Sequence, residues 1–509
     1  MKNIKNKTLL KILINFIFSL SVSLLSLYLM IEIPTSFFKY LTLIIVFLFS
    51  NILFYKKYDD ITKLIIKNKK NCIITLILSG IIFYELTKTS NIEMVSNRIL
   101  EIKCLFYLSF PGLTLIITLS FVKIKDWLKD FIKRMDSFEK KAYIITSIVL
   151  FSLLLIAYFS TDFFYSQYDK IYSLDSGWVY ENMFANSHYY DIRHPLMSIF
   201  TFPIYAIVNF IFSSSLKPII LQFLNIQLLI IIGLELKRLT KNKFVYIFYI
   251  LSFSSILFSL FFEKYILCTF LVVTYVYNIF INKKSSNTLP VFIAGLMPTN
   301  IFVVIVELFK SDKFKNKIKN IIYIGVISLL IIIFFGRIHC LFNGYDEIKK
   351  MKATFGSTNF TIVEKLNSTT KMIQHSFIAV DSDKQSNVYI WNDITKGISF
   401  VGIFVVIIIL FGFWDIYKEK NKIYYSFISA FIFSIILFTV LNWSVHESPL
   451  FSICFSWAII PLFIFGLEKI FTMFKINKKN YKYIYFAILL IMTLINTNQI
   501  IKIFNFITI

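Results

Sequence analysis

Charged residues and cysteines are scarce in this sequence, and their scarcity excludes several classes of protein. Only 16% of the 509 residues are Asp, Glu, Lys or Arg, whereas 57% are hydrophobic and 18% are aromatic. Soluble globular domains carry about 25% charged residues, so the composition excludes an ordinary soluble enzyme and indicates a polytopic membrane protein. The five cysteines are scattered without a C-x-x-C pair, which predicts neither a disulfide framework nor a zinc site.

Common catalytic motifs are also missing. The sequence has no G-x-x-x-x-G-K-[ST] phosphate loop, no H-E-x-x-H pair and no G-x-S-x-G turn. ATP-driven export and zinc proteolysis are therefore not predicted.

Acidic residues are few, 29 against 53 basic ones, which gives a net charge of +24. The lysines cluster in short loops between apolar runs, where positive charge marks the cytoplasmic side of a membrane protein. Membrane topology therefore accounts for the charge, and no nucleic-acid partner is predicted.

Long apolar runs are what the sequence has in abundance. A spanning helix needs about 20 mostly apolar residues, and such runs recur from Leu9–Met30, which we interpret as an uncleaved anchor, to Tyr483–Thr497. Alternation of basic and non-basic loops predicts an all-α polytopic membrane protein with about 13 transmembrane helices.

Three further segments are predicted to be helical but not to be ordinary transmembrane helices. Leu196–Phe212 is assigned to a juxtamembrane or re-entrant helix, because a full crossing would place a basic loop outside. Leu289–Phe309 has lysines at both ends and the breaker GLMPTN in its middle, which predicts a hairpin of two short helices, or alternatively one Pro-kinked helix. Residues 123–141, KIKDWLKDFIKRMDSFEKK, indicate an amphipathic helix on the inner surface.

These segments divide the chain into four predicted parts. Residues 1–141 form an additional N-terminal transmembrane module, and 142–336 form a transmembrane core whose first outer loop is 161–203. Residues 337–396 form an outer loop subdomain, and 397–509 form the C-terminal transmembrane helices.

The stretch Asp162–Pro203 is a polar island between apolar runs. It gathers four aspartates, one glutamate, one arginine and two histidines beside the membrane. Ionisable groups at such a border are costly and usually functional. We interpret this island as the candidate active site.

The island has the groups needed to transfer a sugar from a polyprenyl phosphate. That reaction needs a carboxylate to take the proton of the acceptor, and cationic or hydrogen-bonding groups to hold the leaving phosphate. Aromatic residues commonly stack on sugar faces. The residues that supply these groups within the one loop are Asp175, Trp178, Glu181, Tyr189, Tyr190, Asp191, Arg193 and His194.

The stretch LDSGWVYENMFANSHYYDIRHPLM resembles the first outer loop of the GT-C membrane glycosyltransferases, which include protein O-mannosyltransferases and aminoarabinose transferases. That family carries an acidic pair, a short helix, a tyrosine–aspartate step and a histidine–proline segment. Asp175 stands at the position of the catalytic aspartate, Tyr190 and Asp191 match the tyrosine–aspartate step, and His194 begins the histidine–proline segment. The resemblance implies a GT-C-like fold and a glycosyltransferase that depends on a polyprenyl-phosphate sugar.

Two residues depart from the family pattern. Ser176 replaces the second acid of the pair, and Arg193 stands where the family often has a small or polar residue. No metal ligand is therefore predicted, and a divalent cation is left open as the only cofactor.

Candidates outside the island come from three other loops. Glu263 and Lys264, in the turn FFEKY, match an outer turn where GT-C enzymes often place donor-site residues. Arg337, at the outer end of a crossing, is a candidate phosphate ligand, and His446 and Glu447 approach from a late loop.

Simpler roles compete with each of these assignments. Asp175 also fits the N-cap of a helix, Asp191 a turn, and Arg193 and His194 contacts with lipid headgroups. Glu263 and Lys264 fit a bare charged turn, Arg337 fits a side chain that snorkels to the interface, and His446 and Glu447 fit a hydrophilic loop.

The sequence thus predicts a plasma-membrane glycosyltransferase with its active site on the outer face. Its partners would be membrane lipids, a polyprenyl-phosphate-linked sugar and an acceptor that is an envelope glycan, lipid or protein. Two alternatives stay open. A lipid-linked glycan polymerase would place its key arginines in the 337–396 loop, and a lipid or glycan flippase would place charged groups near the middle of its crossings, where this sequence has few.

Overall fold

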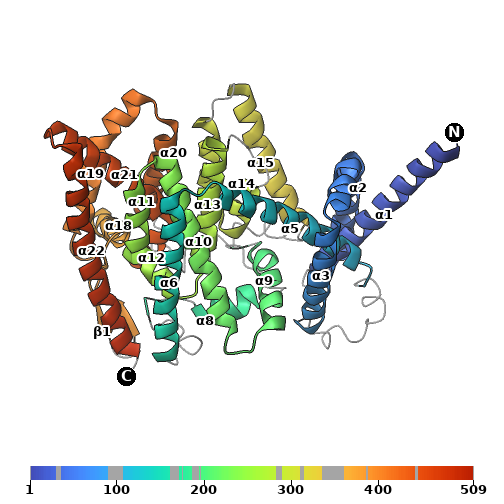
Figure 1. The fold of residues 1–509 in the computed structure, drawn as a ribbon, viewed down its shortest axis with the longest axis horizontal. Coiled ribbons are helices and arrows are strands. Elements are labelled where there is room, and N and C mark those ends of the chain that lie inside the picture. The colour runs from blue at the N-terminus through green and yellow to red at the C-terminus, as the bar shows by residue number, and fades with distance from the viewer. Residues whose placement is uncertain are drawn as a thin grey trace. The chain divides into compact units, whose positions relative to one another are not determined.

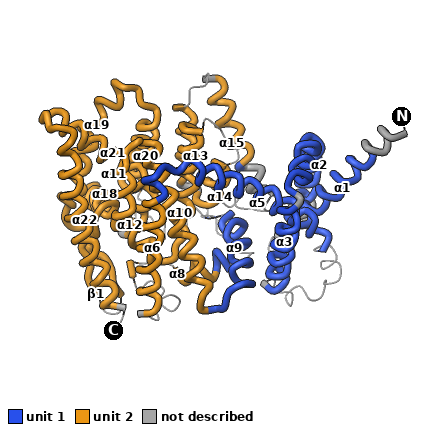
Figure 2. Tube along the Cα trace, viewed as in Figure 1, with its two compact units in different colours: residues 1–140, 182–214, 328–344 blue, residues 141–181, 215–327, 345–509 orange. Residues whose placement is uncertain are grey.

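A computed structural model describes most of the chain, with gaps. The residues it describes are 2–29, 36–89, 107–160, 171–172, 174, 176–185, 194, 196–282, 289–309, 314–334, 360–385, 388–441 and 445–507. The chain forms two compact units (Figure 2). The first contains residues 1–140, 182–214 and 328–344, and the second contains residues 141–181, 215–327 and 345–509.

The first unit is built mainly from helices near the N-terminus. Leu25, Leu113 and Phe202 are buried together in its core, each on a different helix. α1 and α5 approach closely at Gly112, because a Cβ atom there would lie 2.8 Å from the backbone nitrogen of Val22. The described helices of this unit are α1 (Lys2–Leu29), α2 (Ser36–Lys67), α3 (Lys69–Thr89), α5 (Phe110–Lys133) and α9 (Met197–Ile211).

The second unit surrounds α21 (Ser452–Met473), which is buried within the protein from Ser452 to Leu467. Gly466 lets α19 (Phe400–Glu419) pack closely on α21, because a Cβ atom there would lie 2.1 Å from the carbonyl oxygen of Ile408. α10 (Lys217–Thr240) and α13 (Tyr265–Phe280) also contact α21 (Figure 1).

The second unit has further elements around these four helices. They are α6 (Ser137–Ser160), α8 (Ser176–Trp178), η2 (Val179–Phe184), α11 (Lys243–Leu251), α12 (Phe253–Leu260), α14 (Leu289–Leu296), η3 (Pro298–Phe309), α15 (Phe314–Phe334), α18 (Ile362–His375), β1 (Ser382–Gln385), β2 (Val388–Trp391), α20 (Lys422–Ile435), η4 (Ile436–Val440), η5 (Val445–Phe451) and α22 (Lys478–Ile507). A few residues of α6, η2 and α15 belong to the first unit. β1 and β2 pair antiparallel, with Ser382 opposite Trp391.

The prediction of an all-α membrane protein is confirmed, but the count of about 13 crossings is not. Among the described residues, eight helices are long and apolar enough to cross a membrane, or nine if α11 and α12, bent by 56° at Ser252, form one crossing. The apolar run Ile266–Ile281 is one of the predicted crossings, but α13 there has only 16 residues. Leu105–Val122 is another, but α5 begins at Phe110 and continues as a lysine-rich helix to Lys133.

The predicted amphipathic helix at 123–141 is not a separate element. α5 continues to Lys133, and α6 begins at Ser137 after a short break. Asp136 fixes this break, because its carboxylate accepts a hydrogen bond from the backbone of Glu139 at 2.8 Å.

The two other unusual segments are short helices. α9 has 15 residues and contains Pro203, so at about 1.5 Å per residue it is too short for a bilayer core of about 30 Å. The predicted division of Leu289–Phe309 into two short helices is confirmed, since α14 ends at Leu296 and η3 begins at Pro298.

Candidate functional site

Several residues of the predicted site lie outside the described part of the chain. They are Asp175, Tyr190, Asp191, Arg193, Arg337 and the side chain of His446. Their assigned roles stay predictions. The structure places Trp178, His194, Glu263, Lys264 and Glu447.

Residues 171 and 172 of the island are attached to the hairpin of β1 and β2. Ile171 forms a parallel bridge with Tyr389, and the backbone N–H of Tyr172 donates to the carbonyl oxygen of Tyr389 at 2.8 Å. Tyr172 has φ of 52°, a left-handed conformation that is uncommon for a residue with a side chain. The chain therefore turns sharply three positions before the predicted catalytic residue, and contacts of the Tyr172 side chain must offset the strain of this turn.

The side chain of Tyr172 is fully buried. Its ring stacks on Trp391 with centroids 4.7 Å apart, and its hydroxyl lies 2.7 Å from Ser382 Oγ. The side-chain amide of Gln499 donates to the hydroxyl of Tyr172 at 3.0 Å and to that of Tyr389 at 2.8 Å. Burial raises the pKa of Tyr172 well above its ordinary value, so the phenol stays neutral and acts in packing rather than in proton transfer.

His375 completes the socket of side chains that surrounds Tyr172. It is fully buried, and its ring centroid lies 4.8 Å from that of Phe253 and 5.8 Å from that of Trp391. Neither ring nitrogen has a hydrogen-bond partner among the described residues. Burial lowers the pKa of His375 to about 3. The imidazole is therefore neutral at physiological pH and is unsuited to binding a phosphate.

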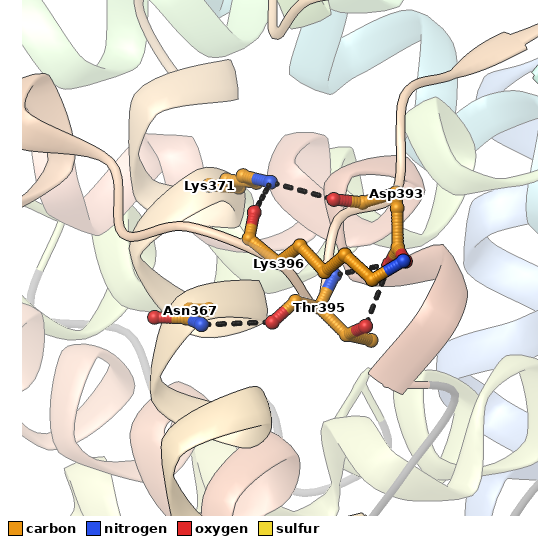
Figure 3. A network of polar contacts seen from close by, with 5 residues as sticks. All are labelled: Asn367, Lys371, Asp393, Thr395 and Lys396. Atoms are coloured by element: carbon orange, nitrogen blue, oxygen red, sulfur yellow. Dashed lines mark hydrogen bonds and ion pairs between the residues drawn. The ribbon is translucent and has the colours of Figure 1, made fainter.

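α18 is held by the turn that precedes α19. Lys371 donates to the carbonyl oxygens of Asp393 at 2.9 Å and Lys396 at 2.7 Å, and the amide of Asn367 donates to the carbonyl oxygen of Thr395 at 2.8 Å (Figure 3). Hydrogen bonds from Thr395 and Lys396 lower the pKa of the Asp393 carboxyl to about 2. These hydrogen bonds thus fix the turn to α18.

α18 is also joined to the late loop that contains η5. The hydroxyls of Ser368 and Ser448 lie 2.6 Å apart, and Ser448 donates to the carbonyl oxygen of Ser368 at 2.9 Å. Glu447 is the neighbour of Ser448 on η5. At the other end of η5, the ring of Phe451 lies 5.6 Å from that of Tyr265. The late loop therefore reaches the start of α13, beside Lys264.

The simpler interpretation of Glu263 and Lys264 as a bare charged turn is wrong. The two residues are only 1% and 5% exposed. The amide of Asn225 on α10 donates to the carbonyl oxygen of Glu263 at 3.3 Å, which draws the turn into the protein. Charged side chains are rarely buried without a specific role.

Lys264 meets the island at Trp178. The ammonium nitrogen lies 5.9 Å from the centroid of the Trp178 ring and 5.2 Å from that of Tyr265, within the range of cation–π attraction. The predicted short helix after position 175 is confirmed, since α8 and η2 run without a break from Ser176 to Phe184. This helix presents Trp178 to the buried ammonium.

The candidate site of the second unit thus consists of Trp178, Glu263 and Lys264, with η5 beside the same turn. A buried ammonium next to an indole suits an anionic group attached to a ring with an apolar face, because the charge attracts the anion and the indole stacks on the ring. His194 is 6% exposed and belongs to the first unit, so it is described apart from these residues.

The described residues contain no group of three His, Cys, Asp or Glu side chains that could hold a metal ion. Sequence reasoning missed the socket formed by Ser382, Trp391, His375 and Gln499 around Tyr172. The aromatic run VYIW at 388–391 was its one local signal. The contact with Gln499, 327 positions away, has no local signal.

Comparison of the chain with known protein families, with characterised proteins and with solved structures finds no match. The functional interpretation therefore depends on the chain's own residues.

Proposed function

We propose that this chain is an integral membrane glycosyltransferase that moves a sugar from a polyprenyl-phosphate donor to an acceptor of the cell envelope. The observation that supports the proposal best is the buried Lys264 beside Trp178, 5.9 Å from its ring. This pair adds a cation for the phosphate and an aromatic face for the sugar to the carboxylate that the sequence supplies at Asp175.

In this proposal Asp175 takes the proton of the acceptor hydroxyl or amine. The acceptor atom forms a bond to the anomeric carbon, and the bond from that carbon to the phosphate oxygen breaks. The polyprenyl phosphate leaves with the bonding electrons, and its negative charge is stabilised by Lys264. The reaction takes place on the outer face of the plasma membrane.

The proposal can be tested by identifying the lipid-linked glycans that accumulate in cells without the gene. In cells that lack it, mass spectrometry should find a polyprenyl-phosphate sugar that disappears when the wild-type gene is returned. Asp175→Asn and Lys264→Met should fail to clear this lipid, although both variants are inserted normally. The matched control Lys422→Met changes an exposed lysine and should clear it.

Full clearance by Asp175→Asn would contradict the proposal. If Arg337→Ala fails more severely than Asp175→Asn, the chain is instead a lipid-linked glycan polymerase.

A further inference from the structure

The second half of α5 carries a pattern that neither the fold nor the proposed site uses. Three pairs follow one another at intervals of four residues: Ile124–Lys125, Leu128–Lys129 and Ile132–Lys133. The three aliphatic side chains are 57%, 38% and 56% exposed. Exposure of successive aliphatic residues on one helix indicates a surface that something apolar covers.

Helix geometry places each kind of residue on its own face. Positions four apart differ by about 40° around a helix, so the aliphatic residues form one stripe, and each lysine lies about 100° further round, along one edge. Asp126 and Asp130 fall on the opposite side from the stripe. Ile124, Leu128 and Ile132, with Lys125, Lys129 and Lys133 along their edge, form a basic stripe.

The rest of the helix is held by protein. The first half of α5 packs through Leu113 and Leu115, which are 8% and 4% exposed, on neighbouring helices of the first unit. In the second half, the rings of Trp127 and Phe131 stack 5.5 Å apart, and Phe131 is 5% exposed. Among the described residues, the six members of the basic stripe are thus exposed, together with Lys123, Asp126 and Asp130.

The second half of α5 lies beside one end of a candidate crossing. α3 contains that candidate crossing, Lys70–Lys88. Lys125 donates to Asn71 at the start of this crossing, whereas Thr118, in the middle of α5, lies 2.8 Å from Thr75 further inside it. If α3 crosses the bilayer, the second half of α5 therefore begins at the level of the membrane boundary.

We infer that the basic stripe docks on anionic lipid headgroups. The aliphatic side chains enter the boundary between headgroups and acyl chains, and the lysines reach the phosphates beside them. Between positions 123 and 133 the helix carries four lysines and two aspartates, a net charge of +2. This arrangement favours an anionic lipid over a zwitterionic one.

Lys129 and Lys133 are the residues to test. Lys125 donates to Asn71 on α3 at 2.9 Å, so its replacement would also disturb packing. A lysine at an anionic surface contributes about fivefold in affinity. The variant Lys129→Gln/Lys133→Gln should therefore bind an anionic lipid many times more weakly.

Native mass spectrometry of the full chain in detergent measures the first binding constants for phosphatidylglycerol and phosphatidylcholine. The wild type should prefer phosphatidylglycerol. The double glutamine variant should lose about fivefold per lysine for phosphatidylglycerol, with phosphatidylcholine binding unchanged. Lys129→Arg/Lys133→Arg should restore the preference, and Lys365→Gln/Lys384→Gln, which removes the same charge elsewhere, should keep it.

Two results would overturn the inference. One is unchanged phosphatidylglycerol binding in the double glutamine variant. The other is an equal loss for both lipids, which would show a disturbed fold rather than a lost charge contact. Neither result bears on the proposed transferase activity, because the variants leave the candidate site intact.

Discussion

At the scale of single residues, strain and its compensation meet at Tyr172. The left-handed backbone at this position costs about 1–3 kcal/mol, and the buried ring and hydroxyl offset that cost through Trp391, Ser382 and Gln499. The hydroxyl thus connects a short turn in the island to the C-terminal helix.

We predict that Tyr172→Phe lowers the free energy of unfolding by about 1–3 kcal/mol, because buried polar partners of the hydroxyl lose a hydrogen bond. Gln499→Leu should cost a similar amount. The double variant should cost clearly less than the sum of the two, since both changes break the same bond. Thermal unfolding of the purified chain measures all three values, and strict additivity would contradict the proposed coupling.

His375 gives a prediction about pH. Its pKa of about 3 in the folded protein lies below the value of about 6.5 for an unfolded histidine. As the pH falls, His375 is therefore protonated at a higher pH in the unfolded chain than in the folded protein. The contribution of His375 to stability is full above pH 6.5 and is lost as the pH falls toward 3, by at most about 1.4 kcal/mol per pH unit.

His375→Phe should remove this part of the acid sensitivity while it keeps the ring contacts. At neutral pH its stability should equal or exceed that of the wild type, because the replaced imidazole has no hydrogen-bond partner among the described residues. Melting temperatures of both proteins between pH 4 and 8 provide the measurement. Parallel curves would show that His375 does not titrate on unfolding.

At the scale of elements, close helix contacts depend on the absence of a side chain. At Gly466 a Cβ atom would lie 2.1 Å from the carbonyl oxygen of Ile408 on α19, whereas at Gly80 on α3 it would meet nothing within 4 Å. The two glycines therefore stand in opposite environments, although both lie inside helices.

We predict that Gly466→Ala destabilises the protein by about 1–3 kcal/mol, because α19 and α21 must move apart. Gly80→Ala should be neutral or stabilising by up to about 1 kcal/mol, since alanine favours the helix. Thermal melts of both variants test the pair. Equal effects at the two positions would mean that the contact between α19 and α21 is looser than described.

At the scale of the whole molecule, the apolar helices could be predicted from sequence, because a run of about 20 apolar residues has few other stable arrangements. For example, the apolar run Pro218–Leu234, which predicts a crossing, falls within α10, and the run Tyr424–Val440, which predicts another, coincides with α20 and η4. The burial of Glu263 and Lys264 could not be predicted, since a charged turn between two helices looks exposed until its neighbours are known. The N-cap or catalytic role of Asp175 stays a prediction.

The order of helices at the end of the chain predicts a topology. If α19, α20 with η4, and α21 each cross once, Lys396 lies outside and Lys420 and Lys475 lie inside. Cysteines placed singly at these positions should react with an impermeant maleimide from outside only at 396. Labelling of 420 in intact cells would reverse or break this alternation.

The socket around Tyr172 also has a consequence for biosynthesis. Tyr172 and Gln499, which donates to its hydroxyl, are 327 residues apart in the chain. Translation at about 5–20 residues per second separates their synthesis by roughly 16–65 s. Tyr172 is therefore synthesised well before the residue that donates to its hydroxyl. A chain that stops before residue 499 would make the earlier helices and the contacts of Tyr172 with Ser382 and Trp391, yet lack this hydrogen bond.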